Sequence, residues 1–380
     1  MNNVSVVEMH VIKNYPFGNP NRDITGSPKW GTFNGEARAR ISSPCLKRII
    51  RKSHYFDDLN TRGIILDIVG TRTREIAYLV EKELESRGNY KEYLDDIKAL
   101  LKKVGKGEDS KSEKDVVQLY SKQDVSKIAD IIVDKINSSG NLKGLSIEKE
   151  LRNYAIRPVT LDILLFGRMA TTASFTTVEA ACAIAQGMGT HKLKTHTDFF
   201  TAVDDVIEEL GESGSGHLDD REFTSNCIYQ YYVIDIDLFI ENLKKYNIEN
   251  EDVDYDTLKE IVSDVVVRFI NAVANTCPTG MYHSMPSNPP ISAMIVQLRE
   301  KHNGFSYNSA FLESAEGNIL KTSISNLFNY TNNRDICDGT PYKRYWVNPD
   351  GDKEITLNFG INSESIDNLT ASVKEDIIGK

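Results

Sequence analysis

Histidine and carboxylate side chains of the kind that form metal or catalytic sites occur close together in two places. His191 and His196 are five positions apart, so they are not the i, i+4 pair with which a helix binds zinc. His217 lies beside Asp219 and Asp220, but no fourth ligand follows at a spacing usual for zinc. We therefore expect no bound metal.

Two further patterns come close to known sites without completing them. The run GESGSG at residues 211–216 lacks the Lys-Ser/Thr of a phosphate-binding loop, and no G-x-S-x-G nucleophile elbow occurs. The carboxylates of TAVDDVIEEL, residues 201–210, are better explained as a solvated acidic face than as an acid–base pair. The sequence thus predicts no catalytic residues and no cofactor.

A different chemistry is concentrated in ARARISSPCLKRIIRKSHY, residues 37–55. This segment has no carboxylate and contains six cations: Arg38, Arg40, Lys47, Arg48, Arg51 and Lys52. The whole chain has 45 Lys and Arg against 55 Asp and Glu, a net charge of −10. Residues 1–56 carry nine cations and three acids, a net +6, so the rest sums to −16. No acid at i±4 neutralises the helix cations, which favours a polyanion-binding surface over an ordinary solvated face.

The elements around this segment are expected to hold its charges together. If RARISS is extended, its two arginines point to the same side of the chain. Ser43 then suits a helix N-cap and Pro44 the first helical position, with the helix continuing to about Ser53. The cations occupy one arc of this helix, and the opposite face comprises Leu46, Ile49, Ile50 and Ser53.

The rest of the chain alternates strand-like and helix-like patterns. Strands are expected at residues 4–12, 158–169, 222–239 and 292–298, and a long amphipathic helix at residues 255–277. Residues 58–156 have the mixed-charge amphipathic pattern of a helical insertion. Without this insertion the order is β-α-β-β-α-β, which predicts an α+β fold of ferredoxin-like, RNA-recognition-like topology.

Composition is that of a globular protein, with 40% hydrophobic and 26% charged residues. The sequence contains no apolar run long enough to span a membrane and no signal-peptide pattern at its start. Its five cysteines include no C-x-x-C pair, which is typical of buried thiols in a reducing compartment. We therefore expect a cytoplasmic protein without membrane contact.

The sequence also resembles the CasC family, the repeated backbone subunit of the type I-E CRISPR surveillance complex, Cascade. The resemblance is specific from about residue 5 to 245 and thinner beyond. It is carried by several motifs in the family's order: NRD (21–23), R-I-S-S-x-x-L-K-R-x-x-R-K-S (40–53), GRMAT (167–171), FTAVDD (200–205), GSGHL (214–218) and EFTS (222–225).

The resemblance implies a non-catalytic, hand-shaped subunit whose copies polymerise along one guide RNA (crRNA). The complex, which includes other Cascade subunits, kinks the guide periodically and presents it for pairing with target DNA in antiviral defence. The implied domains are palm (1–57, with the basic helix), helical finger (58–156), palm strand region (157–185), thumb β-hairpin (186–221) and remaining palm (222–380).

The family's functional positions carry over to two groups of residues. Guide-RNA contacts are expected from Arg22, Lys29, Arg38, Arg40, Ser42, Lys47, Arg48, Arg51, Lys52, Arg168, Met169 and Phe175. The thumb tip, a compact wedge between bases, is expected to comprise Phe200, Thr201 and Val203. Without the resemblance, core packing would be the preferred interpretation of Phe199 and Phe200.

The sequence departs from better-known family members in three places. The family often has methionines after GRMAT, whereas this chain has TASF (172–175), in which Phe175 is a possible replacement. The loop at residues 279–290 has no lysine or arginine, and the thumb return is acidic. The alternative function is a metal-dependent endoribonuclease that processes CRISPR RNA on a ferredoxin-like fold, because related folds support both roles.

Overall fold

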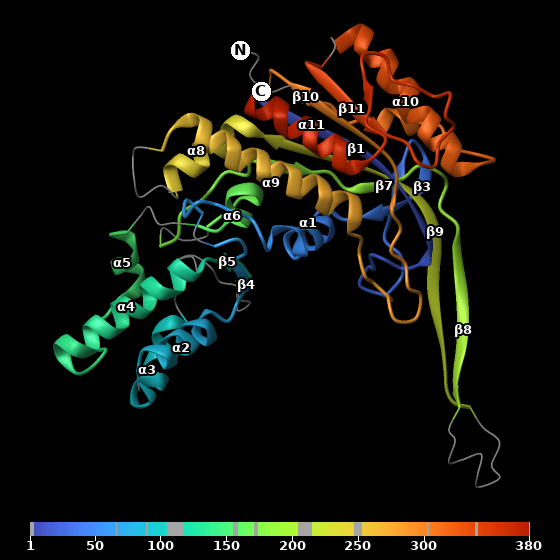
Figure 1. Ribbon diagram of the computed structural model, residues 1–380. Coiled ribbons are helices and arrows are strands. Elements are labelled where there is room, and N and C mark those ends of the chain that lie inside the picture. The colour runs from blue at the N-terminus through green and yellow to red at the C-terminus, as the bar shows by residue number, and fades with distance from the viewer. Residues whose placement is uncertain are drawn as a thin grey trace. The chain divides into compact units, whose positions relative to one another are not determined.

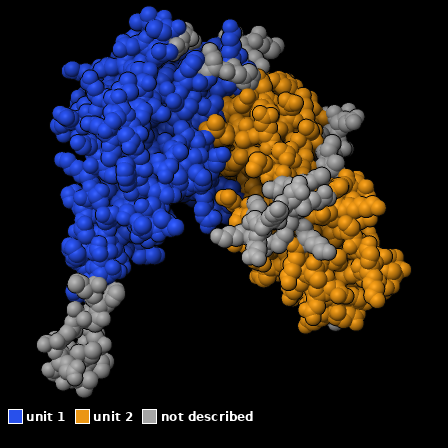
Figure 2. Space-filling model, turned by 180° about the vertical axis from the view of Figure 1, so that it is seen from behind, with its two compact units in different colours: residues 1–55, 184–233, 266–380 blue, residues 56–183, 234–265 orange. Residues whose placement is uncertain are grey.

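The computed structural model describes most of the chain. The described residues are 4–65, 67–88, 90–102, 104, 117–154, 159–170, 174–203, 215–246, 253–301, 304–338 and 341–379. They form two compact units, each discontinuous in sequence (Figure 2). The first unit comprises residues 1–55, 184–233 and 266–380, and the second comprises residues 56–183 and 234–265.

The first unit is built on a large mixed sheet with strand order β12-β11-β10-β1-β9-β7-β3-β2 (Figure 1). Its strands are β1 (Val6–Gly18), β2 (Trp30–Phe33), β3 (Glu36–Ile41), β7 (Gly187–Gly189), β9 (Ser215–Asp235), β10 (Ile291–Arg299), β11 (Lys343–Val347) and β12 (Ile361–Asn362). Off this path, β9 also pairs with β6 (Cys182–Ile184) and β8 (Thr195–Val203). β1 is antiparallel to β10, whereas β12 is parallel to β11.

β1 is buried on both faces over its first eight residues, as expected for a central strand. The strand continues to Gly18, past the predicted end at residue 12, so part of the predicted loop is strand. Three of its buried side chains are polar: Glu8, His10 and Lys13. Because buried polar groups must be hydrogen-bonded, these residues require partners from neighbouring strands.

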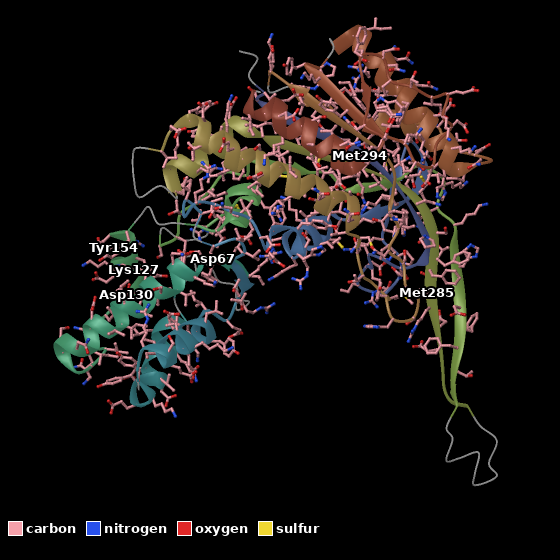
Figure 3. The ribbon with its side chains drawn as sticks, in the orientation of Figure 1. Asp67, Lys127, Asp130, Tyr154, Met285 and Met294 are labelled. Atoms are coloured by element: carbon pink, nitrogen blue, oxygen red, sulfur yellow. The ribbon has the colours of Figure 1, made fainter. Side chains whose placement is uncertain are left out.

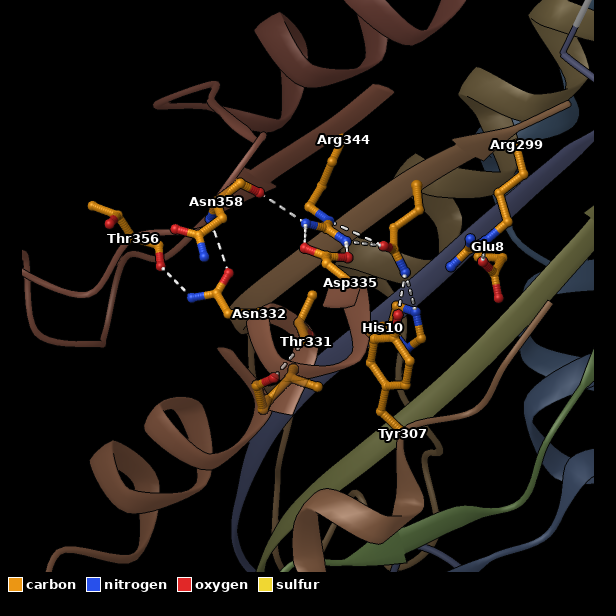
Figure 4. A network of polar contacts seen from close by, with 12 residues as sticks. Glu8, His10, Arg299, Tyr307, Thr331, Asn332, Asp335, Arg344, Thr356 and Asn358 are labelled. Atoms are coloured by element: carbon orange, nitrogen blue, oxygen red, sulfur yellow. Dashed lines mark hydrogen bonds and ion pairs between the residues drawn. The ribbon is translucent and has the colours of Figure 1, made fainter. Parts of the chain in front are cut away.

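Figure 4 shows how those partners are supplied to Glu8. Its carboxylate forms a buried ion pair with Arg299, which lies opposite Val6 on β10. It also accepts hydrogen bonds from the Tyr231 hydroxyl (2.6 Å) and the Phe305 backbone N–H (2.6 Å). Tyr231 lies on β9, so this one carboxylate joins three adjacent strands.

His10 has the neighbours of a neutral imidazole. Its Nε2 accepts from the Gln297 side-chain amide (2.9 Å), its Nδ1 lies 2.9 Å from the Tyr229 hydroxyl, and Tyr307 stacks on the ring at 4.1 Å. Burial lowers the pKa of His10 well below its usual value, and the charges of Arg299 and Arg344 lower it further. The imidazole therefore has a structural role, fixing the register of β1 against β10.

Helices and irregular segments cover the sheet. They include α1 (Ser43–Arg51), α9 (Tyr255–Asn275), α10 (Ile319–Asp338), α11 (Ile366–Ile378), and the short 3-10 turns η1 (His54–Phe56) and η3 (Asn308–Phe311). The apolar core beside α10 and η3 contains Phe311, Phe328 and Trp346, the last two in edge contact with ring centroids 5.5 Å apart. The expected helix at 255–277 is thus confirmed.

The second unit is largely helical, as predicted for residues 58–156. It contains α2 (Ile76–Arg87), η2 (Lys91–Tyr93), α3 (Leu94–Leu101), α4 (Lys122–Ser139), α5 (Ile147–Arg152), α6 (Leu161–Phe166), α8 (Ile236–Tyr246) and a two-stranded sheet of β4 (Thr71–Thr73) and β5 (Gln118–Tyr120). α4 begins with a capping box formed by Ser121 and Asp124. Lys127 lies over the Tyr154 ring at 3.7 Å, beside α5 (Figure 3).

The predicted strand at residues 158–169 is wrong, because residues 161–166 form the helix α6. A six-residue apolar run has no distinctive period, so sequence alone does not separate a buried strand from a buried helix turn. Two local features end the ambiguity: Asp162 accepts the Gly70 N–H at 3.1 Å, and Gly167 stops the helix at φ 76°. Among the helices of the described residues, none is both long and apolar enough to cross a bilayer.

Candidate nucleic-acid interface

The NRD motif, residues 21–23, forms a tight loop in which two of three side chains have structural work. The Asn21 side-chain oxygen accepts the Ser42 backbone N–H at 2.9 Å, which fastens the loop to the start of α1. The Asp23 carboxylate accepts from the backbone N–H groups of Thr25 (2.9 Å) and Ser27 (3.0 Å). Arg22 between them is exposed, and no ion pair is recorded for it within the described residues. Only the arginine of this motif is therefore placed to bind a ligand.

The helix N-cap is Ser42 rather than Ser43, so Pro44 is at the second helical position. The Ser42 side chain makes no capping hydrogen bond, although its backbone is in the extended conformation of a cap. Its backbone N–H is already used by Asn21, and the side chain is only half-buried. The predicted contact residue Ser42 thus lies where a ligand would meet the start of α1.

Cations around α1 divide into exposed and buried ones. Arg48 and Lys52 are exposed, Lys29 and Lys47 are half-buried, and Arg51 is only 8% exposed. Leu46 and Ile50 are buried as predicted, whereas Ile49 is half-buried. Arg51 lies on the arc predicted to face solvent, so the helix is turned further toward its neighbours than the periodicity indicated.

Arg38 lies inside the first unit and is only 1% exposed. Its guanidinium donates to the backbone oxygens of Gly189 (3.4 Å) and Phe311 (3.2 Å) and pairs with Glu36 at 3.3 Å. Burial lowers its pKa from the usual value. Arg40, two residues on, is only half-buried and donates to the Gln186 side-chain oxygen at 2.6 Å. Strand alternation put the two arginines on the same side, as predicted, but only Arg40 approaches the surface.

Arg168 is also an internal side chain, located in the second unit. It forms an ion pair with Asp124 at 2.6 Å, with both side chains almost fully buried, and donates from Nε to the Thr176 backbone oxygen at 3.0 Å. Phe175 is 4% exposed and packs edge-on against Tyr120 within the helical core. Met169, by contrast, is 83% exposed. If this part of the second unit contacts a ligand, Met169 is the side chain that reaches it.

β8 and β9 form a long antiparallel ribbon that extends beyond the sheet (Figure 1). The pairing runs from Thr195 opposite Thr224 to Val203 opposite Ser215, with a register shift after Ala202. Residues 204–214 of the expected thumb lie outside the described residues. The described part of the expected thumb contains a β-hairpin, and its last described residues include the FTAV stretch at 200–203.

The ribbon places the predicted wedge residues on two faces. Successive side chains of a strand alternate, so Phe199 and Thr201 share one face and Phe200 lies on the other. Phe199 is 72% exposed and Thr201 is exposed. The Arg221 guanidinium covers the Phe200 ring at 4.1 Å to its centroid. Core packing is therefore wrong for Phe199, and Phe199 and Thr201 are the pair available as a wedge.

An aromatic group at the base of the ribbon was not predicted. Phe223 of β9 stacks on His196 of β8 at 5.5 Å and meets Phe17 of β1 edge-on at 5.6 Å. Phe17 is 63% exposed. No sequence motif marks these residues, because the pairing of β8 with β9 is what brings them together. Exposed aromatic rings of this kind are suited to stack on unpaired bases.

A cavity of about 570 Å³ lies beside the ribbon, between the NRD loop and residues 279–284. Its lining includes Arg22 and Arg221, together with Tyr282, His283 and Ser284. Arg221 donates to the Ser284 hydroxyl at 3.4 Å. The loop 279–290 has no cation of its own, but these two arginines from other segments supply positive charge next to it.

The candidate catalytic residues remain apart in the described residues. No three His, Cys, Asp or Glu side chains among them cluster as a metal site requires. His191 accepts the Cys227 backbone N–H at 3.3 Å, and its pKa is lowered by burial. The side chain of His217 lies outside the described set, and Asp219 and Asp220 are exposed. All five cysteines are free thiols.

Solved structures share this fold: an α+β protein with a large mixed sheet, a helical second unit and a long β ribbon. One chain of a "CRISPR RNA-guided surveillance complex, pre-nicking" matches with a TM-score of 0.76 at 24% identity, covering 97% of this chain and 100% of that chain. One chain of a "CRISPR RNA-guided surveillance complex" matches with a TM-score of 0.56 at 19% identity, covering 97% and 99%.

The family is established by sequence. The profile of the CT1975-like protein family matches residues 7–372, and the chain belongs to this family. A search of curated proteins finds no match.

Proposed function

We propose that this protein is a non-catalytic, guide-RNA-binding subunit of a CRISPR surveillance complex of the Cascade type, equivalent to CasC of type I-E. Its family and its fold relatives, which come from RNA-guided surveillance complexes, support this role. Copies of the chain polymerise along the guide with other subunits, and the guide pairs with target DNA.

Within this role the fold supplies a palm, a finger and a thumb. The central strand order β10-β1-β9-β7 supports a ferredoxin-like palm, because it is the order 4-1-3-2 of a β-α-β-β-α-β unit. The β8–β9 ribbon is the thumb, and the helices of residues 58–156 form the finger.

One observation carries the proposal: cations without recorded ion pairs gather around the start of α1. Arg22, Arg40, Arg48 and Lys52 come from the NRD loop, β3 and α1, within one compact unit of an acidic protein. Phosphate contacts of this kind bind RNA without reading its sequence, as a guide-binding protein requires. Lys29, Lys47 and Ser42 extend the same surface, whereas Arg38 and Arg51 hold it in place from inside.

The thumb is proposed to shape the RNA rather than to anchor it. Phe199 and Thr201 carry no charge, so they add little to long-range attraction. An inserted wedge unstacks bases at a cost of about a few kcal/mol per step, which phosphate contacts must offset. Met169 and the Phe17–Phe223 group are further surfaces for unstacked bases.

The test separates binding from cleavage. RNA-free protein is titrated with two end-labelled, guide-length RNAs of unrelated sequence, with and without Mg²⁺ or Mn²⁺. We expect similar affinities, a steep salt dependence and intact RNA. Cleavage at a defined position that disappears in His217→Ala or Asp219→Ala protein would contradict the proposal and establish the endoribonuclease.

A further inference from the structure

A second recess lies in the first unit, on the part of the sheet formed by β2, β3 and β7. It has a volume of about 400 Å³. Its lining includes Phe33, Arg38, Arg40, Gln186, Met188 and Asn308. Small-molecule sites begin at roughly 300 Å³, so this recess is large enough for one nucleoside-sized ligand.

Three polar atoms of this lining are buried without a hydrogen-bond partner: Arg38 Nε, Arg40 Nε and Asn308 Oδ1. A buried polar group without a partner is costly, and native structures contain few of them. Three at one recess indicate a ligand that supplies two acceptors and one donor.

The walls of the recess suit a flat ring. Phe33 and Met188 are half-buried apolar side chains, and Met188 lies directly opposite Arg40 in the β3–β7 pairing. The Arg38 guanidinium is 5.9 Å from the centre of the Phe33 ring. Aromatic and thioether groups pack well against heteroaromatic faces, and single-stranded RNA is commonly recognised by stacking combined with hydrogen bonds to base edges.

An acidic peptide is the other ligand that two arginines favour, and two features argue against it. A carboxylate has only acceptors, so it leaves Asn308 Oδ1 unpaired and repels it. Glu36 already pairs with Arg38 at 3.3 Å, which reduces the positive charge available to an anion.

We propose that this recess binds a single unstacked nucleobase. This inference rests on the proposed function, because the base belongs to the bound RNA: β3 runs from the recess through Ser42 into the phosphate-binding end of α1. The edge of cytosine offers two acceptors and an exocyclic amine donor, which complements the three unpaired atoms in full. Uracil has an acceptor oxygen in place of that amine, so it leaves Asn308 Oδ1 unpaired.

The experiment uses uncharged nucleosides, so that phosphate attraction does not contribute. RNA-free full-length protein is mixed with cytidine, uridine or adenosine, and binding is measured by saturation-transfer NMR and titration calorimetry. We expect cytidine to bind more tightly than uridine. Asn308→Leu is expected to weaken cytidine binding about tenfold, because the donor of the base loses its acceptor. Asn308→Asp, which keeps an acceptor, retains binding.

Ser309→Leu is the matched control, since Ser309 is exposed in the same turn and is not part of the recess. Loss of cytidine binding in Ser309→Leu as well, no binding of any nucleoside, or preferential binding of an Asp-Glu dipeptide would overturn the inference. Guide-length RNA binding is measured in parallel. If the long RNA binds and nucleosides do not, only this inference fails; if the long RNA fails to bind, the proposed function fails.

Discussion

The strongest prediction from the interface concerns Arg48 and Lys52, the two exposed cations of the basic segment. Neither has a recorded ion pair or hydrogen bond from its side chain within the described residues, and both side chains are exposed. Arg48→Gln with Lys52→Gln should therefore change the free energy of unfolding by no more than about 0.5 kcal/mol. The same double substitution removes two phosphate contacts.

The size of the effect follows from counterion release. Each contact to single-stranded nucleic acid contributes about 0.7 to the slope of log K against log salt concentration. Losing two contacts should reduce the slope by about 1.4. At about 0.15 M salt this corresponds to roughly tenfold weaker binding, or about 1.4 kcal/mol.

Filter binding at several salt concentrations, with two unrelated guide-length RNAs, measures this slope. The charge-matched control is Lys143→Gln with Lys353→Gln, two exposed lysines outside the predicted interface, which should leave the slope unchanged. An unaltered slope in the Arg48/Lys52 variant, or a loss of affinity for only one of the two RNAs, would refute the reasoning.

Three further predictions address the ribbon, the second unit and the sheet. Phe199→Ala with Thr201→Ala should keep RNA loading within about tenfold but abolish the periodic exposure of guide bases to chemical probes, whereas Phe200→Ala should keep the pattern. Arg168→Met should destabilise the fold by about 3–5 kcal/mol in urea unfolding, because it leaves Asp124 buried without its cation, whereas Arg87→Met at a more exposed pair should cost no more than about 1 kcal/mol. Because the pKa of His10 is lowered on folding, the stability it contributes is present above about pH 6.5 and is lost below it; His10→Gln should flatten the fall in unfolding free energy between about pH 7 and pH 5, and an unchanged pH profile would contradict this.

The sequence predicted elements with strong periodicity well. The basic helix, the helices of residues 58–156 and the long helix near residue 255 were all foreseen, because each repeats an apolar face over several turns. The strand assigned to residues 158–169 failed because its apolar run is too short to have a period.

The roles of single side chains were harder to predict. Arg38, Arg51 and Arg168 have the charge of surface residues, yet each is buried by segments distant in sequence; Phe311, which accepts from Arg38, is 273 positions away. Phe175 was a candidate ligand contact but packs in the helical core. Conversely, Phe199 resembled a core residue, and only the pairing of β8 with β9 reveals that it is exposed.

The central claim is that the chain binds a guide RNA as a repeated, non-catalytic subunit. Its most direct test is to purify the protein from cells that also express a CRISPR array, treat it with ribonuclease and size the RNA that remains bound. The proposal predicts protected RNA of discrete length whose sequence follows the array and varies freely between spacers. The absence of protected RNA, or fragments without a defined length, would contradict it.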